Sequence, residues 1–281
     1  MDKQFWVTIQ ANNYEIPKGH AVHALTEELI SYIGSTDPEL RDTIGLEAFY
    51  NWLKRGLYHP DDLHGYALRL VSNLQKGIGG IEDDSVFLRS FSALWLSLIV
   101  QYDNEMQVLV KEDIAQILAA ALTYFSAEAD LRGYVPVKGY AHAIAHASDL
   151  LGALSHHQYL DASDHMDILD CIAEKMKNVT DWIFIHNEDS RIARTVLGIF
   201  TCNTLSMDQI RDWLAALSRN WNGAWRREGE ARAYFNGRNL IRALHWHIIT
   251  LKDRQVPNKE TIVRLVQETL EQARPWEWIE A

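Results

Sequence analysis

The chain is poor in the residues that mark disulfide-stabilised, loop-rich or membrane proteins. Its 281 residues include only two cysteines, six prolines and 15 glycines. Cys171 and Cys202 lie among apolar residues without CxxC spacing, so we expect buried free thiols rather than a disulfide framework. No segment approaches the roughly 18 consecutive apolar residues that a membrane-spanning helix needs. Together these absences favour a soluble, cytoplasmic protein.

Positive charge is also scarce. The chain has 27 Lys and Arg against 38 Asp and Glu, which gives a formal net charge of -11. Binding to nucleic acid or to an anionic membrane needs a basic surface, so we expect neither as a partner unless basic residues gather on one face. Hydrophobic residues make up 47% of the chain, with ten Trp and eleven Tyr, which suffices for a sizeable core.

Helical periodicity runs along most of the sequence. Ile114, Ile117, Leu118 and Ala121, for example, recur at the spacing of one helix face. The segment Ser206–Gln209 has the pattern of an N-terminal capping box. We predict one domain over residues 1–281, with residues 1–18 as a less regular N-terminal arm. The predicted helices are at 19–34, 38–55, 60–76, 85–102, 109–127, 138–154, 161–180, 189–202, 207–219, 234–252 and 258–273.

A weak internal repeat suggests how these helices are arranged. Arg89, Arg194 and Arg242 each introduce a cation into an apolar helix, and the helix that carries His142 falls between the first two. The spacing of roughly fifty residues suits one helix pair per repeat. We therefore predict an all-α fold of stacked helix pairs that form a superhelix, a solenoid like those of HEAT and armadillo proteins. A closed helical toroid is the alternative.

Several segments resemble one known family. They are Val86–Leu94, Glu128–Tyr134 continuing into Lys138–Leu150, and Asn187–Arg191, with a weaker match at Phe235–Leu244. These segments are similar to a bacterial family known as domain of unknown function 2785, and the likeness runs from about Leu40 to Leu251. Tyr140 stands where tryptophan is expected in that family. The resemblance implies an all-helical, soluble bacterial protein and supplies no catalytic residue.

The most distinctive motif is a row of three polar residues. Within the predicted helix, His142, His146 and Asp149 are spaced i, i+4 and i+7 and share one face. Two histidines at this spacing can bind one metal ion, with the carboxylate as a further ligand. The expected fourth ligand is Glu128 or Asp130, or else Glu188 or Asp189 from another helix. The same residues could instead form a polar ligand pocket without metal. A third interpretation places the imidazoles at a contact between neighbouring helices, hydrogen-bonded to carbonyls or carboxylates.

The segment before this row carries two cations. Arg132 and Lys138 lie in a turn with two glycines, close to the start of the predicted helix. Cations beside a helix N-terminus favour anion binding. The alternative is that Arg132 pairs with Asp130 or Glu128 and holds the turn in place.

The arginines at helix positions allow two interpretations as well. If Arg89, Arg191, Arg194 and Arg242 face a concave surface, their guanidinium groups suit carboxylate or phosphate ligands. They could equally form salt bridges within the fold. For that case the expected partners are Asp83, Asp103, Glu188 and Asp189.

Aromatic residues concentrate late in the chain, and we interpret them mainly as helix-packing core. They are Trp213, Trp221, Trp225, Tyr234, Phe235, Trp246, Trp276 and Trp278.

Three functions follow from these patterns. The first is a solenoid that binds a small anionic ligand or a protein segment, without catalysis and without a cofactor. The second is a metal-assisted hydrolase or related enzyme that uses a divalent metal ion at His142, His146 and Asp149. The third is a purely structural interaction protein. The expected ligand-contacting residues are Arg89, Arg132, Lys138, Tyr140, His142, His146, Asp149, Arg194 and Arg242.

Overall fold

The computed structural model describes residues 1–251 and 256–273, and the regular secondary structure of these residues is almost entirely helical. The predicted all-α fold class is confirmed. The sequence predicts one domain, whereas the backbone contacts group the chain into two compact units, Met1–Leu154 and Ser155–Ala281.

The N-terminal unit contains eight helical segments and one small hairpin. In chain order they are α1 (Lys3–Ala11), α2 (Val22–Tyr32), the π-helix η1 (Glu39–Leu46), α3 (Glu47–Lys54), α4 (Pro60–Asn73), α5 (Ser85–Met106), α6 (Lys111–Ala127), β1 (Tyr134–Val135), β2 (Gly139–Tyr140) and α7 (Ala143–Ser155).

The sequence does not predict the first helix. Residues 1–18 contain α1, where an irregular arm is expected. The carboxylate of Asp2 caps this helix by accepting a hydrogen bond from the backbone N–H of Phe5 at 2.8 Å. Trp6 and Ile9 are buried, so α1 belongs to the core of the unit. Nine residues are too few for a clear apolar period, which is why the sequence does not reveal the helix.

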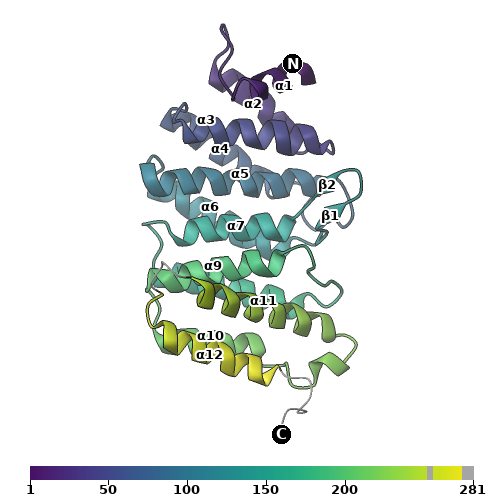
Figure 1. The fold of residues 1–281 in the computed structure, drawn as a ribbon, viewed down its shortest axis with the longest axis vertical. Helices are drawn as coiled ribbons and strands as arrows, with labels where there is room; N and C mark the ends of the chain where they lie inside the picture. The colour runs from purple at the N-terminus through teal and green to yellow at the C-terminus, as the bar shows by residue number, and fades with distance from the viewer. Residues whose placement is uncertain (252–255, 274–281) are drawn as a thin grey trace. The chain divides into compact units, whose positions relative to one another are not determined.

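Helices of the N-terminal unit pack against their second neighbours as well as their first. Helix α4 packs on both α5 and α6, and α3 packs on α5 (Figure 1). The stacked rings of Phe49 and Trp95, with centroids 4.1 Å apart, join α3 to α5. Helix α5 is long and apolar enough to cross a membrane by length and composition, but 67% of that stretch is buried inside the structure. It serves here as a core helix.

A short hairpin precedes α7 and shifts the start of that helix. Strands β1 and β2 pair antiparallel, with Tyr134 opposite Tyr140 and Val135 opposite Gly139. The turn between them uses positive φ values, 69° at Val137 and 78° at Gly139. The predicted start of a helix at residue 138 is therefore wrong, and α7 begins five residues later, at Ala143.

The C-terminal unit contains α8 (Ala162–Asn178), α9 (Glu188–Cys202), α10 (Met207–Ser218), the 3₁₀ helix η2 (Ala224–Arg226), α11 (Ala231–Thr250) and α12 (Lys259–Gln272). Helix α11 packs on α9 and α12, and α10 packs on α8 and α12. The predicted capping box at the start of α10 is confirmed: Ser206 Oγ accepts from the backbone N–H of Gln209 at 3.2 Å, and the Gln209 side chain accepts from the backbone N–H of Ser206 at 3.0 Å.

Candidate functional site

The loop that the sequence singles out, residues 128–142, is held by a buried ion pair. The Arg89 guanidinium donates to Glu128 through Nε at 2.7 Å and through Nη2 at 2.9 Å, and both side chains are 0% exposed. Nη1 of Arg89 donates to the Lys76 carbonyl and to Ser85 Oγ. Arg89 therefore has no surface to offer a ligand, which corrects its predicted role. Its partner is Glu128, which is none of the four carboxylates expected.

The two cations of the loop itself are also engaged within the N-terminal unit. Arg132 forms a two-point contact with Asp130, at 2.8 and 2.5 Å, and also donates to the Asp83 carbonyl. The Lys138 ammonium lies 2.7 Å from an Asp84 carboxylate oxygen. The interpretation of Arg132 as a residue that holds the turn is confirmed. The predicted anion site at Arg132 and Lys138 is not supported, because carboxylates of the same unit already contact both cations.

A further arginine, which the sequence does not suggest, anchors the hairpin. Arg41 is buried between the rings of Phe87 and Phe91, with its guanidinium carbon 4.3 and 4.5 Å from their centroids. It donates to the carbonyl of Lys138 at 2.9 Å and to that of Ser35 at 2.7 Å. The loop is thus attached to the helices by its backbone as well as by its charges.

The His-x3-His-x2-Asp row is broken at its first member. His142 has a left-handed backbone with φ of 51° and precedes α7, so only His146 and Asp149 lie in that helix. His146 is buried, and its Nδ1 lies 2.8 Å from Ser90 Oγ. The rings of His142 and His146 still meet edge to face, with centroids 5.7 Å apart. The His142 ring stacks on exposed Tyr140 at 4.2 Å.

These contacts fit the interpretation in which the imidazoles pack between structural elements. Among residues 1–251 and 256–273, no three His, Cys, Asp or Glu side chains come together as a group that could hold a metal ion. The hydrolase hypothesis therefore has no ligand set in the part of the chain that the structure describes.

A different surface emerges on α11, in the C-terminal unit. This helix carries Arg232, Arg238 and Arg242 and contains no Asp or Glu, although the whole chain has a net charge of -11. Its exposed positions Arg242, Trp246 and Ile249 are spaced i, i+4 and i+7, so they form one row along the helix. Trp246 is 63% exposed and Ile249 is 46% exposed. We call these three residues the α11 row.

Two residues of the row, Arg242 and Trp246, line an open recess of about 580 Å³. It is lined by Asp189, Asn239, Arg242, Ala243, His245, Trp246 and Leu270. Within the described ranges, neither Arg242 nor Arg194 forms an ion pair, and both are exposed. Of the arginines that the sequence proposes for ligand contact, these two are available to a ligand.

The helix α9 contributes a polar contact beside the row. Ser190 Oγ lies 2.9 Å from Nε2 of His247. Burial, and next the positive charge of Arg194, lower the pKa of His247, so the ring is neutral at neutral pH. No carboxylate among the described residues contacts the other ring nitrogen, so the orienting member of a Ser–His–carboxylate triad is lacking here. The contact joins α9 to α11.

A comparison with known protein families identifies the family of this chain. A family model described as a protein of unknown function, DUF2785, matches residues 74–246, more than half of the sequence. The chain belongs to the DUF2785 family. This confirms the resemblance drawn from the sequence and supplies no activity. No curated protein matches the chain, and no solved structure does.

The sequence pattern does not single out two members of the α11 row. Trp246 is expected in the core with the other late aromatics, of which Trp213 and Tyr234 are indeed buried. Ile249 stands in no predicted site. The spacing i, i+4 and i+7 from Arg242 is a usable signal, since Leu240, Ile241, Leu244 and Ile248 already fill the opposite, buried face. Trp276 and Trp278 lie outside the described residues.

Proposed function

We propose that this DUF2785 protein is a soluble, non-catalytic binding protein of the α-solenoid type, whose α11 row contacts a protein segment with acidic and apolar side chains. The observation that carries the proposal is the pairing of an exposed, unbridged Arg242 with a largely exposed Trp246 on one helix face. Tryptophan and arginine are the residues most enriched at the energetic centres of protein interfaces.

The packing inside each unit supports the solenoid assignment. In stacked helix pairs, each helix contacts the equivalent helix of the next pair. The contacts α3 with α5 and α4 with α6 follow this rule in the N-terminal unit, as do α8 with α10, α9 with α11 and α10 with α12 in the C-terminal unit. A reducing, cytoplasmic compartment agrees with Cys171 and Cys202, both free thiols.

Charge complementarity supports an acidic partner. The three arginines of α11 have no carboxylate on their own helix, and Arg194 adds a further exposed cation on α9. A guanidinium group binds a carboxylate through two parallel hydrogen bonds. Trp246 and Ile249 offer apolar area beside it, so the preferred segment would place an apolar residue next to Asp or Glu.

Selection from a random peptide library tests the proposal, because the protein itself then chooses the partner chemistry. The wild-type protein should enrich peptides with Asp or Glu adjacent to apolar residues. An enriched peptide should bind Arg242→Ala roughly thirtyfold more weakly, the equivalent of about 2 kcal/mol. The matched control is Arg264→Ala on α12, an exposed arginine near Glu268, and it should bind as wild type does.

Two results would count against the proposal. If the enriched peptides lack Asp and Glu, the partner is not an acidic segment. Equal loss of binding in Arg242→Ala and Arg264→Ala would show that the effect comes from net charge and not from the row.

A further inference from the structure

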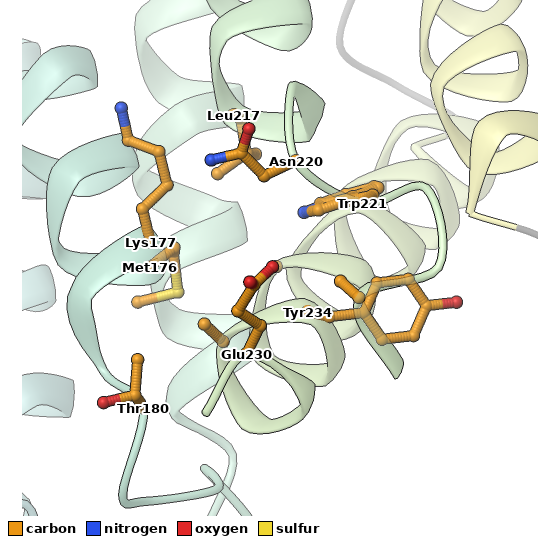
Figure 2. Close-up of a pocket in the computed structure, with 11 residues that line it drawn as sticks. Met176, Lys177, Thr180, Leu217, Asn220, Trp221, Glu230 and Tyr234 are labelled. Atoms are coloured by element: carbon orange, nitrogen blue, oxygen red, sulfur yellow. The ribbon is translucent and has the colours of Figure 1, made fainter. Parts of the chain in front are cut away.

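A second cavity in the C-terminal unit shares no residue with the α11 row. It lies between the end of α8, the α10–η2 segment and the start of α11, and Figure 2 shows its walls. Its volume is about 80 Å³. A volume of roughly 10–15 Å³ on this measure holds one water molecule, so the cavity has room for a small organic ring.

The inner surface of this cavity is apolar. Met176, Leu217 and Ala224 are all buried and line it. Binding of a ring to such a surface is favourable, because the ring displaces poorly bound water. The thioether of Met176 also makes favourable contacts with aromatic rings.

One donor on a buried side chain faces this space. Trp221 is 5% exposed, and in Figure 2 its indole nitrogen points toward the cavity between Met176, Asn220 and Glu230. Among the residues that the structure describes, none accepts a hydrogen bond from this N–H. The indole N–H of a tryptophan as buried as this one usually has a hydrogen-bond partner. The position therefore suits a ligand that supplies an acceptor.

The surrounding residues fix the orientation of Trp221. Its ring meets Tyr234 edge to face, with centroids 6.1 Å apart. The Tyr234 hydroxyl donates to the Ala273 carbonyl, and in Figure 2 it points away from the cavity. A Cβ atom at Gly237 would lie 2.8 Å from Cζ2 of Trp221, so the indole can take this place only over a glycine. The donor is thus held in one direction.

The charges at the rim are balanced. The Lys177 ammonium pairs with Glu174 at 2.5 Å, and the Glu230 carboxylate pairs with Arg227 at 2.5 Å. Neither charge is left to attract an ion of the opposite sign. A neutral ligand therefore fits this site better than an anion or a cation.

We infer that this cavity binds a small neutral ring compound that accepts a hydrogen bond from Nε1 of Trp221. The apolar wall supplies affinity for the ring, and the single fixed donor selects compounds with an acceptor at the ring edge. The site is independent of the partner surface proposed for α11.

Pyridine and benzene make a matched pair of probes, because they have the same size and differ in one acceptor nitrogen. Titration of ¹⁵N-labelled protein at a pH where pyridine is neutral should shift the indole N–H signal of Trp221, assigned with Trp221→Phe. The other indole signals should stay in place. Benzene should bind about tenfold more weakly, as expected for the loss of one hydrogen bond of roughly 1.4 kcal/mol.

Two variants complete the test. Ala233→Leu places a larger side chain in the cavity and should abolish binding, whereas Ala231→Leu, outside the cavity lining, should not. Trp221→Phe should bind pyridine and benzene equally. The inference is overturned if pyridine moves several indole signals alike, if folded Ala233→Leu binds as wild type does, or if Trp221→Phe keeps the preference for pyridine.

Discussion

The loop 128–142 and the α11 row both present charged and aromatic residues, but they use them differently. Arg132 and Lys138 of the loop, and Arg89 of α5, which holds it, each contact a carboxylate of the same unit. On α11, Arg242 is exposed and forms no ion pair within the described ranges, and Trp246 extends toward solvent. A buried cation must find its partner inside the fold, whereas an exposed one is free to meet a ligand. An ion pair within the fold, fully buried only at Arg89, therefore separates structural charges from those available for binding.

The largest effect should come from breaking the ion pair in the loop. Arg89→Ala leaves the carboxylate of Glu128 buried without its cation, so we expect a loss of about 3–5 kcal/mol in the free energy of unfolding. Urea unfolding measures this. The control is Arg69→Ala, whose exposed pair with Glu27 should contribute roughly 1 kcal/mol or less. Similar losses in both variants would show that burial does not distinguish the two pairs.

The α11 row should respond in binding and not in stability. Trp246→Ala should weaken binding of a library-selected peptide by roughly thirtyfold, because an exposed tryptophan at an interface centre contributes about 2 kcal/mol. Its unfolding free energy should change by less than about 0.5 kcal/mol. The matched control is Tyr50→Ala, another exposed aromatic residue on α3. Peptide affinity that falls equally in both variants would contradict the assignment.

A smaller effect is expected at the contact between α5 and α7. Ser90 Oγ donates to the Ala141 carbonyl and lies against His146 Nδ1, so Ser90→Ala removes a partner from two buried groups. We expect a loss of about 1–3 kcal/mol in unfolding free energy. Ser31→Ala, at an exposed serine on α2, should change stability by less than about 0.5 kcal/mol in the same assay. If Ser90→Ala unfolds like wild type, this part of the loop is not anchored as described.

The smallest effect concerns pH and the link between α9 and α11. The pKa of His247 is lowered from 6.5 in the fold, so the unfolded chain binds the proton more readily. The contribution of neutral His247 to the free energy of unfolding is present above pH 6.5, and it is lost as pH falls through the lowered pKa. The free energy of unfolding of wild type, minus that of His247→Gln, should therefore decrease as pH falls from about 7.5 to about 5. If the difference in unfolding free energy stays constant with pH, the pKa of His247 is not lowered in the fold.

Much of the fold could be predicted from the sequence, because apolar periodicity and capping residues are local signals. Most helices from α2 to α12 follow those signals, although the predicted helix 38–55 is divided into η1 and α3, and the capping box at Ser206 has the expected geometry. The start of α7 could not be predicted. The hairpin that delays it depends on Arg41, distant in sequence, which binds the carbonyl of Lys138, and on the left-handed backbone of His142.

The candidate site was harder to predict, for a related reason. The sequence shows which residues are charged but not which of them find partners across the fold. Arg89 and Arg242 look alike in the sequence, each within an apolar helix, yet one is fully buried against Glu128 and the other is exposed. The spacing of His142 and His146 likewise implies a shared helix face that the backbone at His142 does not provide.

Hydrogen exchange with a library-selected peptide bound tests the central contrast most directly. The peptide should slow backbone exchange along residues 238–250 of α11 and leave exchange in the loop 128–142 unchanged. Protection of the loop without protection of α11 would show that the binding surface lies where the charges are already paired, and would contradict the contrast between the two regions.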